Sequence, residues 1–459
     1  MSRCMELLMA AGMSAGEAAA KKLLFERTLQ AMPRDGERGG PPRAFYVPGR
    51  IEILGKHTDY AGGRSLLCTV ERGFCLIARP RQDDQVQVIN ARSRARCSLA
   101  LSPKLKPSER LWCNYPGMVA RRMARNFPNA RQGADIAFIS DLPAASGMSS
   151  SSALMVAVFL ALADVNDLEN SDQYRREIHG PEDLAGYLGA VENGESFGSL
   201  AGDLGVGTFG GSEDHVAILC CRPGELSQYS FCPIRHERNL KLPDDHVLIV
   251  GVSGVAAIKT GESRARFNRM SLAARAILET WRAATGRHDP TLAAAVASDH
   301  DAPDRIRRFL DASTHETFPA SELRDRLEQF LDESMNIIPS AGAALAAGDL
   351  PLFGALTDRS QKNAESLLGN QVPETVDLVR AARSLGAVAA SAFGAGFGGS
   401  VWALCRVEHA AEFERRWATW YRVRFPGVGR ARFFRSFPGP PAMRLNSADT
   451  EPRSAKPQF

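Results

Sequence analysis

The 459-residue sequence predicts an α+β fold organised as two domains. Short apolar runs, separated by glycine and charged residues, crowd into residues 44–139, and this pattern is typical of strands. Longer stretches with helical periodicity dominate after residue 262. The chain is long enough for more than one hydrophobic core, and the two patterns meet near residue 240. We therefore predict one domain over residues 1–240 and a second over residues 241–435.

Helices and strands are predicted in mixed order within residues 1–240. Met1–Met32 carries a weak amphipathic pattern and is predicted to be helical, and Pro33–Pro42 is predicted to be a loop. The predicted strands are Ala44–Val47, Ile51–Leu54, Ser65–Val70, Cys75–Ala78 and Ala134–Ile139, and the predicted helices are Asn114–Phe127, Ser149–Ala163 and Pro181–Glu195. The glycine-rich stretch Gly198–Gly211 is predicted to be an irregular loop.

The second predicted domain follows the turn Lys241–Asp245 and begins with an apolar strand. Its predicted strands are Val247–Val252, Ser400–Cys405 and Arg430–Phe434, and its predicted helices are Glu262–Ala284, Ala302–Leu310, Ala320–Phe330, Val376–Leu385 and Ala410–Phe425. Residues 436–459 contain five prolines and few apolar side chains, so we predict a disordered tail there.

Composition excludes several classes of protein. The net charge of +4 suits anionic ligands such as nucleotides, but no concentrated basic stripe indicates nucleic-acid binding. The longest apolar run, Ala153–Ala163, is shorter than the roughly 18–20 residues that span a bilayer, so no membrane partner is expected. Nine scattered cysteines without a C-x-x-C pair, and an N-terminus without a signal peptide, predict a cytoplasmic protein.

The segment Asp141–Ala153 (DLPAASGMSSSSA) leads directly into an apolar helix. Small residues let the backbone approach a triphosphate, and the first turn of a helix offers free N–H groups and a positive dipole end. Four consecutive hydroxyls add donors and a possible magnesium ligand. The alternative interpretation is an ordinary serine-rich helix cap.

The segment Pro48–Gly63 (PGRIEILGKHTDYAGG) joins an apolar strand to a charged cluster. Its polar members are Arg50, Lys56, His57 and Asp59, and Gly62-Gly63 closes the turn. A strand that ends in such side chains is a common way for a fold to present polar groups to a small ligand.

Asp214 lies in Phe209–Leu219 (FGGSEDHVAIL), after a Gly-Gly turn and before a run that we predict to be a strand. Phosphoryl transfer to a hydroxyl needs an oriented acceptor and a place for its proton, and a carboxylate can supply both. Arg50 would favour the ionised form of that carboxylate. An acid that merely starts a strand is an equally open interpretation. Glu192, on a predicted helix, is a candidate magnesium ligand, although a surface role is commoner for a helical glutamate.

These segments, in this order, resemble the galactokinase-like members of the GHMP family of small-molecule kinases. The matching segments are PGRIEILGKHTDYAGG, Trp112-Cys113-Asn114-Tyr115, LPAASGMSSSSA, GGSEDH in place of the family's G-I-M-D-Q, Gly348–Ser360, Pro373–Val379 and Gly394–Gly399. The resemblance implies a two-lobed α+β architecture with the active site in the cleft between an N-terminal domain and a ferredoxin-like C-terminal domain. It also implies ATP-dependent phosphorylation of the anomeric hydroxyl of a galactose-like sugar.

The resemblance assigns roles residue by residue. Asp214 would be the catalytic acid/base residue, with Arg50 as its partner. The implied sugar contacts are Lys56, His57, Asp59 and Gly211; the implied nucleotide contacts are Trp112, Tyr115, Gly147, Met148, Ser149, Ser150, Ser151 and Ser152; the implied magnesium ligands are Ser151 and Glu192. The expected partners are ATP, Mg²⁺ and a small sugar, and a monomer is expected although the oligomeric state is open.

Several departures from the family pattern concern the sugar. Lys56 stands where the family has a glutamate that contacts the hydroxyl on carbon 6, and His215 stands where it has a glutamine. The spacing from Glu192 to Asp214 is longer, and Gly261–Asn268 contains no tyrosine. A lysine that faces carbon 6 would suit a uronic acid such as galacturonate, whereas a lysine that points to solvent would not affect the sugar. The alternatives to a galactokinase are therefore a kinase of a uronic acid or arabinose and a catalytically inactive sugar- and ATP-binding regulator; the presence of both Asp214 and Arg50 favours an enzyme.

Overall fold

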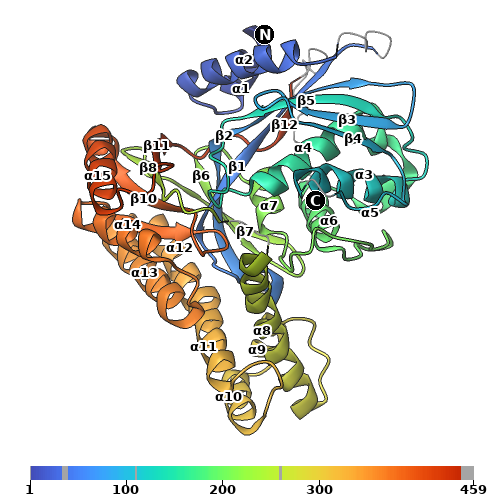
Figure 1. The fold of residues 1–459 in the computed structure, drawn as a ribbon. Helices are drawn as coiled ribbons and strands as arrows, with labels where there is room; N and C mark the ends of the chain where they lie inside the picture. The colour runs from blue at the N-terminus through green and yellow to red at the C-terminus, as the bar shows by residue number, and fades with distance from the viewer. Residues whose placement is uncertain (1, 34–39, 109–110, 258–260, 446–459) are drawn as a thin grey trace.

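In the computed structural model, the described residues are 2–33, 40–108, 111–257 and 261–445. They form two β-sheets, one from each half of the chain, with helices packed on both (Figure 1). This arrangement confirms the α+β prediction. No helix among the described residues combines the length and the apolar character needed to cross a bilayer.

The first sheet has eight strands, seven from residues 43–241 and one, β12, from near the C-terminus. Its main path is β12-β1-β2-β5-β3-β4, and β6 and β7 extend it from β2. The bounds are β1 Arg43–Leu54, β2 Arg64–Pro80, β3 Gln85–Asn90, β4 Arg96–Ala100, β5 Ala134–Ser140, β6 Glu225–Ser230, β7 Arg235–Lys241 and β12 Met443–Arg444. All pairs are antiparallel except β3 with β5. The two strands predicted within residues 44–54 form the single strand β1, because Pro48-Gly49 marks a register shift and not a turn. The two strands predicted within residues 65–78 likewise form the single strand β2.

Helices cover both faces of this sheet. Their bounds are α1 Ser2–Ala10, α2 Ala15–Gln30, α3 Asn114–Asn126, α4 Ser150–Val165, α5 Asp172–Glu177, α6 Pro181–Asn193 and α7 Glu213–Cys220. Alternation along β1 assigns the faces: Tyr46 packs in the cluster that contains Phe25 of α2, whereas Val47 packs in the cluster that contains α4. Helix α4 is apolar on nearly all sides, which is why it can lie in the centre of this half.

The second sheet is antiparallel, with the order β11-β8-β10-β9. Its bounds are β8 His246–Val252, β9 Ala389–Phe393, β10 Ser400–Arg406 and β11 Arg432–Ser436. The helices of this half are α8 Gly261–Thr285, α9 Leu292–Val296, α10 Ala302–Ala312, α11 Ala320–Leu331, α12 Ile338–Ala346, α13 Leu350–Asn363, α14 Pro373–Ser384 and α15 Ala410–Arg424. In Figure 1, α8 to α11 extend away from both sheets as a helical arm, and this arm has a separate core around Trp281 and Phe330.

The first sheet ends with β7 and the second begins with β8, so we propose that the domain boundary lies between them. The prediction of a disordered tail from residue 436 is wrong for residues 436–445. Ser436 belongs to β11, and β12 (Met443–Arg444) pairs with Phe45 and Tyr46 of β1. Backbone pairing of this kind needs few apolar side chains, which is why composition misled the prediction. Residues 446–459 lie outside the described residues.

Candidate active site

Arg50 and Asp214 form a buried ion pair between β1 and α7. Arg50 Nε donates to Asp214 Oδ1 at 2.8 Å, and Arg50 Nη2 lies 2.7 Å from the same oxygen. The exposed fractions of the two side chains are 5% and 17%. Burial alone would lower the pKa of Arg50, but Asp214, Glu213 and Glu52 outweigh it, so this pKa is raised and the guanidinium stays charged.

The run after Asp214 is helical, so the predicted strand there is wrong. Helix α7 spans Glu213–Cys220 and is buried against α6 and the first sheet. A short apolar run without alternation cannot be assigned to strand or helix from its pattern. The correction has a chemical consequence, because Asp214 now lies in the first turn of a helix, where the backbone dipole favours a negative charge.

Glu192, near the end of α6, lies close to the ion pair. Ser152 Oγ is 2.8 Å from Glu192 Oε2 and 3.3 Å from Asp214 Oδ2, and His215 Nε2 is 3.4 Å from the same Glu192 oxygen. Ser151 and Glu192 are the predicted magnesium ligands, and the serine in direct contact with Glu192 is the next one, Ser152. Consecutive residues of a helix point about 100° apart, so only one of the two serines can face Glu192.

A cavity of about 420 Å³ opens beside the serine loop. Of the predicted nucleotide contacts, those that line it are Trp112, Tyr115, Gly147, Ser149, Ser150 and Ser151. Met148 and Ser152 do not: Met148 is 1% exposed within the core, and Ser152 points toward Glu192. Their assignment as nucleotide contacts is therefore corrected.

The backbone and hydroxyls of the serine loop are arranged for an anionic ligand. Gly147 and Ser149 adopt left-handed conformations, with φ of 77° and 57°, immediately before α4 begins at Ser150. Ser149 Oγ is buried and has no hydrogen-bond partner among the described residues. Arg50 Nη1 donates to the Gly147 carbonyl at 2.6 Å and so ties this loop to the ion pair. A phosphate oxygen would give the Ser149 hydroxyl the partner that it lacks.

A second pocket, the acceptor pocket, lies on the other side of Arg50 and includes the predicted sugar contacts His57, Asp59 and Gly211. Asp59 Oδ2 accepts from the Glu213 backbone N–H at 3.1 Å. A Cβ atom on Gly211 would lie 2.2 Å from that carboxylate oxygen, so this position requires glycine. These contacts hold the segment that follows β1 against the segment that precedes α7.

His57 is held in one orientation at the edge of the acceptor pocket. Its Nδ1 lies 3.0 Å from the Tyr60 hydroxyl, and its Nε2 lies 3.2 Å from the Ala395 carbonyl. A carbonyl can only accept, so Nε2 carries the proton in this arrangement. Phe267 packs against the ring at 5.4 Å between centroids and also lines the pocket. Phe267 thus lines the acceptor pocket, and it comes from the segment in which the sequence analysis noted the missing tyrosine.

Lys56 does not belong to the acceptor pocket, and its assignment as a sugar contact is corrected. Its Nζ donates to Ser391 Oγ at 2.8 Å and to Ser360 Oγ at 3.3 Å, in β9 and α13 of the second half. The residue is only 1% exposed, so it does not point to solvent either. The ammonium links the two halves of the protein, and the argument for a uronic acid loses its basis.

Two glutamates that the sequence analysis did not single out line the acceptor pocket. Glu52 and Glu213 are 3% and 6% exposed, and their carboxyl groups are hydrogen-bonded to each other. Burial raises the pKa of Glu52 to about 7, while Lys56 and Arg50 oppose the shift. Burial also raises the pKa of Glu213 well above its ordinary value, and Glu52 adds to that effect. Strand alternation could have indicated Glu52, since it shares a face of β1 with Arg50.

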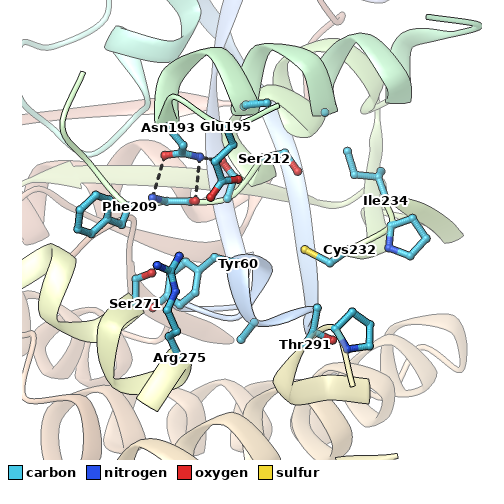
Figure 2. A pocket seen from close by; sticks show the side chains of 18 of the residues that line it. Tyr60, Asn193, Glu195, Phe209, Ser212, Cys232, Ile234, Ser271, Arg275 and Thr291 are labelled. Carbon is cyan, nitrogen blue, oxygen red and sulfur yellow. Dashed lines mark hydrogen bonds between the residues drawn. The ribbon is translucent and has the colours of Figure 1, made fainter. Parts of the chain in front are cut away.

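A larger cavity, of about 490 Å³, adjoins the acceptor pocket behind Gly210-Gly211 (Figure 2). The dashed lines in Figure 2 mark the contacts of Asn193 that hold this segment: its Nδ2 donates to the Gly210 carbonyl at 2.8 Å, and its Oδ1 accepts from the Gly210 N–H at 3.0 Å. Asn193 was not predicted as a functional residue. Its place one residue after Glu192 gave no signal that its amide would fix the pocket wall.

Three family models match the sequence. They are the galactokinase galactose-binding signature over residues 36–80, the GHMP kinases N-terminal domain over residues 114–189 and the GHMP kinases C-terminal domain over residues 343–423. The matched segments contain Arg50, His57 and Asp59 in the first model and the serine loop in the second.

Curated relatives and a solved structure agree with these models. The chain is 28% identical over 358 residues to a galactokinase from a Roseiflexus strain, and the aligned region covers 77% of this chain and 81% of that protein. It is also 28% identical over 394 residues to a galactokinase from Chloroflexus aggregans, which covers 84% and 90%. The solved structure of Lactococcus lactis galactokinase with galactose aligns with a TM-score of 0.74 and 21% identity, over 92% of this chain and 99% of that one. The two-lobed GHMP kinase fold is thereby confirmed.

Proposed function

We propose, from the premise that this chain belongs to the GHMP kinase family, that it is a galactokinase-type sugar-1-kinase. It would transfer the γ-phosphoryl group of ATP to the anomeric hydroxyl of a galactose-like sugar. The observation that carries this proposal is the position of Arg50, which lines both the nucleotide cavity and the acceptor pocket and is paired with Asp214. This position supports Asp214 as the catalytic carboxylate, since a phosphate donor and a hydroxyl acceptor would meet beside Arg50.

Asp214 would orient the anomeric hydroxyl and accept its proton. Arg50 keeps the carboxylate paired and, as a permanently charged group at the junction, would also stabilise charge that develops on the transferred phosphoryl group. His57, Asp59 and the Gly211 backbone would position the sugar. Positioning matters here because phosphoryl transfer depends mainly on alignment and electrostatic stabilisation.

ATP would occupy the cavity beside the serine loop. Trp112 and Tyr115 offer aromatic surface for the base, and the start of α4 offers N–H groups for the phosphates. The unpartnered Ser149 hydroxyl fits a phosphate oxygen. All nine cysteines are free thiols, so a reducing cytoplasmic location is part of the proposal.

Mg²⁺ is the further cofactor in this proposal. Glu192 and Ser151 would hold it, because Glu192 lines the acceptor pocket and Ser151 lines the nucleotide cavity, and both present hard oxygen ligands. Ser152, which donates to Glu192, would orient the carboxylate. When bound, the ion would neutralise negative charge on the phosphates.

The test is ADP release with galactose by the Asp214→Asn variant. Loss of the general base is expected to lower kcat by about 10²- to 10⁴-fold. Asp172→Asn is the matched control, because Asp172 is exposed in the first turn of α5, and its kcat should equal that of the wild type. Binding of ATP by Asp214→Asn, measured by calorimetry, should persist. Near-normal turnover in Asp214→Asn would overturn the catalytic assignment, and ATP binding without turnover of any sugar by the wild type would support an inactive regulator.

A further inference from the structure

The acceptor pocket carries an excess of carboxyl groups. Those that line it are Glu52, Asp59, Glu192, Glu213 and Asp214. Arg50 is the only lysine or arginine among the described lining residues, and it is already paired with Asp214. The remaining basic side chains in the lining are His57 and His215. The pocket therefore presents negative charge to whatever enters it.

Four of these carboxyl groups accept hydrogen bonds from donors within the protein. Asp214 accepts from Arg50, Asp59 accepts from the Glu213 N–H, and Glu192 accepts from Ser152. Glu213 accepts from Ser65 Oγ at 2.7 Å. Glu52 differs, because its hydrogen bond is to the Glu213 carboxyl, which is another acid.

Glu52 is incompletely satisfied although it is buried. The residue is 3% exposed, and no donor among the described residues reaches its Oε1 atom. Lys56, whose positive charge favours the ionised form of Glu52, donates to two serines of the second half. A buried carboxylate oxygen without a donor is costly, and a ligand that brings a donor to Oε1 removes that cost.

We propose that Glu52 is a substrate-contacting, specificity-determining residue that makes the acceptor pocket select an amino sugar over a uronic acid. The inference rests on the proposed sugar-kinase function and names the substrate class of the same site. The ammonium of an amino sugar donates to the Glu52 carboxylate and offsets the negative charge of the pocket. The carboxylate of a uronic acid would add negative charge beside these carboxyl groups, while Arg50 is already paired with Asp214, and neutral galactose lies between the two cases.

The experiment compares kcat/KM for galactosamine, galactose and galacturonate at neutral pH in the wild type and in Glu52→Gln. Gln keeps the size of the side chain and removes its charge. The ratio of galactosamine to galactose is expected to fall by about 10- to 100-fold in Glu52→Gln, which is the range for a hydrogen bond to a charged group. Glu6→Gln, an exposed change on α1, should leave the ratio at the wild-type value.

The outcomes separate this inference from the proposed function. If the wild type phosphorylates none of the sugars, the sugar-kinase proposal fails and the inference fails with it. If galactose is phosphorylated but Glu52→Gln keeps the wild-type ratio, only the inference is overturned. Should Glu52→Gln not fold, the wild type alone decides: a kcat/KM for galacturonate equal to or above that for galactosamine contradicts the inference.

Discussion

At the scale of single residues, buried charges decide how the site is built. Lys56 is 1% exposed and links the end of β1 to Ser391 and Ser360. Ser360 in turn donates to Glu333, whose Oε1 also accepts from the Gly55 N–H. The lysine therefore supplies positive charge to a buried polar network that contains a glutamate. These contacts support a structural role for Lys56, at a position where family resemblance suggested a sugar contact.

Replacement of Lys56 by methionine tests this role. Removing one member of a buried charged network is expected to lower the free energy of unfolding by about 3–5 kcal/mol, because the neighbouring carboxylates lose their cation. Urea denaturation measures the change. Lys104→Met is the control, since Lys104 is exposed and its loss should alter stability little. Equal stability of Lys56→Met and the wild type would contradict the network role.

Glu52 should make stability depend on pH. Its pKa is about 7 in the folded protein against an ordinary 4.5, so the folded chain holds more protons than the unfolded chain between these values. The contribution of Glu52 to the free energy of unfolding therefore falls as the pH rises through that range. Since one unit of pKa corresponds to about 1.4 kcal/mol, the full effect is on the order of 3 kcal/mol.

The measurement is urea denaturation of the wild type and Glu52→Gln at several pH values between 4.5 and 7. The free energy of unfolding of the wild type should fall relative to that of the variant as the pH rises. Burial and the neighbouring Glu52 raise the pKa of Glu213 as well, and this shift acts in the same direction. Parallel curves for the two proteins would mean that Glu52 ionises normally.

At the scale of elements, the segment Gly210-Gly211 before α7 forms a wall of the acceptor pocket and fixes its shape. Asn193 holds Gly210 through both of its amide atoms, and Gly211 lies directly against Asp59. The wall thus positions a proposed sugar contact together with the start of α7, which carries the proposed catalytic residue Asp214. It also separates the acceptor pocket from the larger cavity of Figure 2.

Gly211→Ala should displace Asp59 or the wall, because the new Cβ would lie 2.2 Å from the Asp59 carboxylate. A displacement of this size can lower activity by about 100-fold. Steady-state kinetics with galactose should show that loss in kcat/KM, with ATP binding retained. Gly427→Ala is the matched control, since a Cβ there meets nothing within 4 Å. Wild-type kinetics for Gly211→Ala would exclude the proposed role of the wall.

The sequence predicted these elements unequally. Alternating or continuous apolar runs placed β5, β8 and β10 within a residue or two of their observed bounds, because buried strands leave a strong local pattern. Helix α7 was mistaken for a strand, since its apolar run is too short to distinguish the two. Strand β12 was missed because its pairing with β1 depends on backbone groups more than 390 residues apart in the chain.

At the scale of the whole molecule, both halves of the chain contribute residues to the acceptor pocket. Arg326 of α11 donates to the His57 carbonyl, and Gln329 donates to the Lys56 carbonyl at 3.1 Å. His57 also contacts Ala395 in the glycine segment after β9. Motifs in the sequence could predict Arg50 and Asp214 as partners, but these contacts between the halves have no local signal. For that reason the sequence could not predict which groups Lys56 contacts or that Glu52 lines the acceptor pocket.

The most direct test of the central claim is identification of the product formed from galactose and ATP. The reaction should be followed by phosphorus and carbon NMR, with Asp214→Asn as the inactive reference. The proposed function predicts an ATP-dependent phosphate ester on the anomeric carbon, formed by the wild type and nearly absent with the variant. A phosphate on another carbon, or no sugar phosphate while ATP is bound, would contradict it.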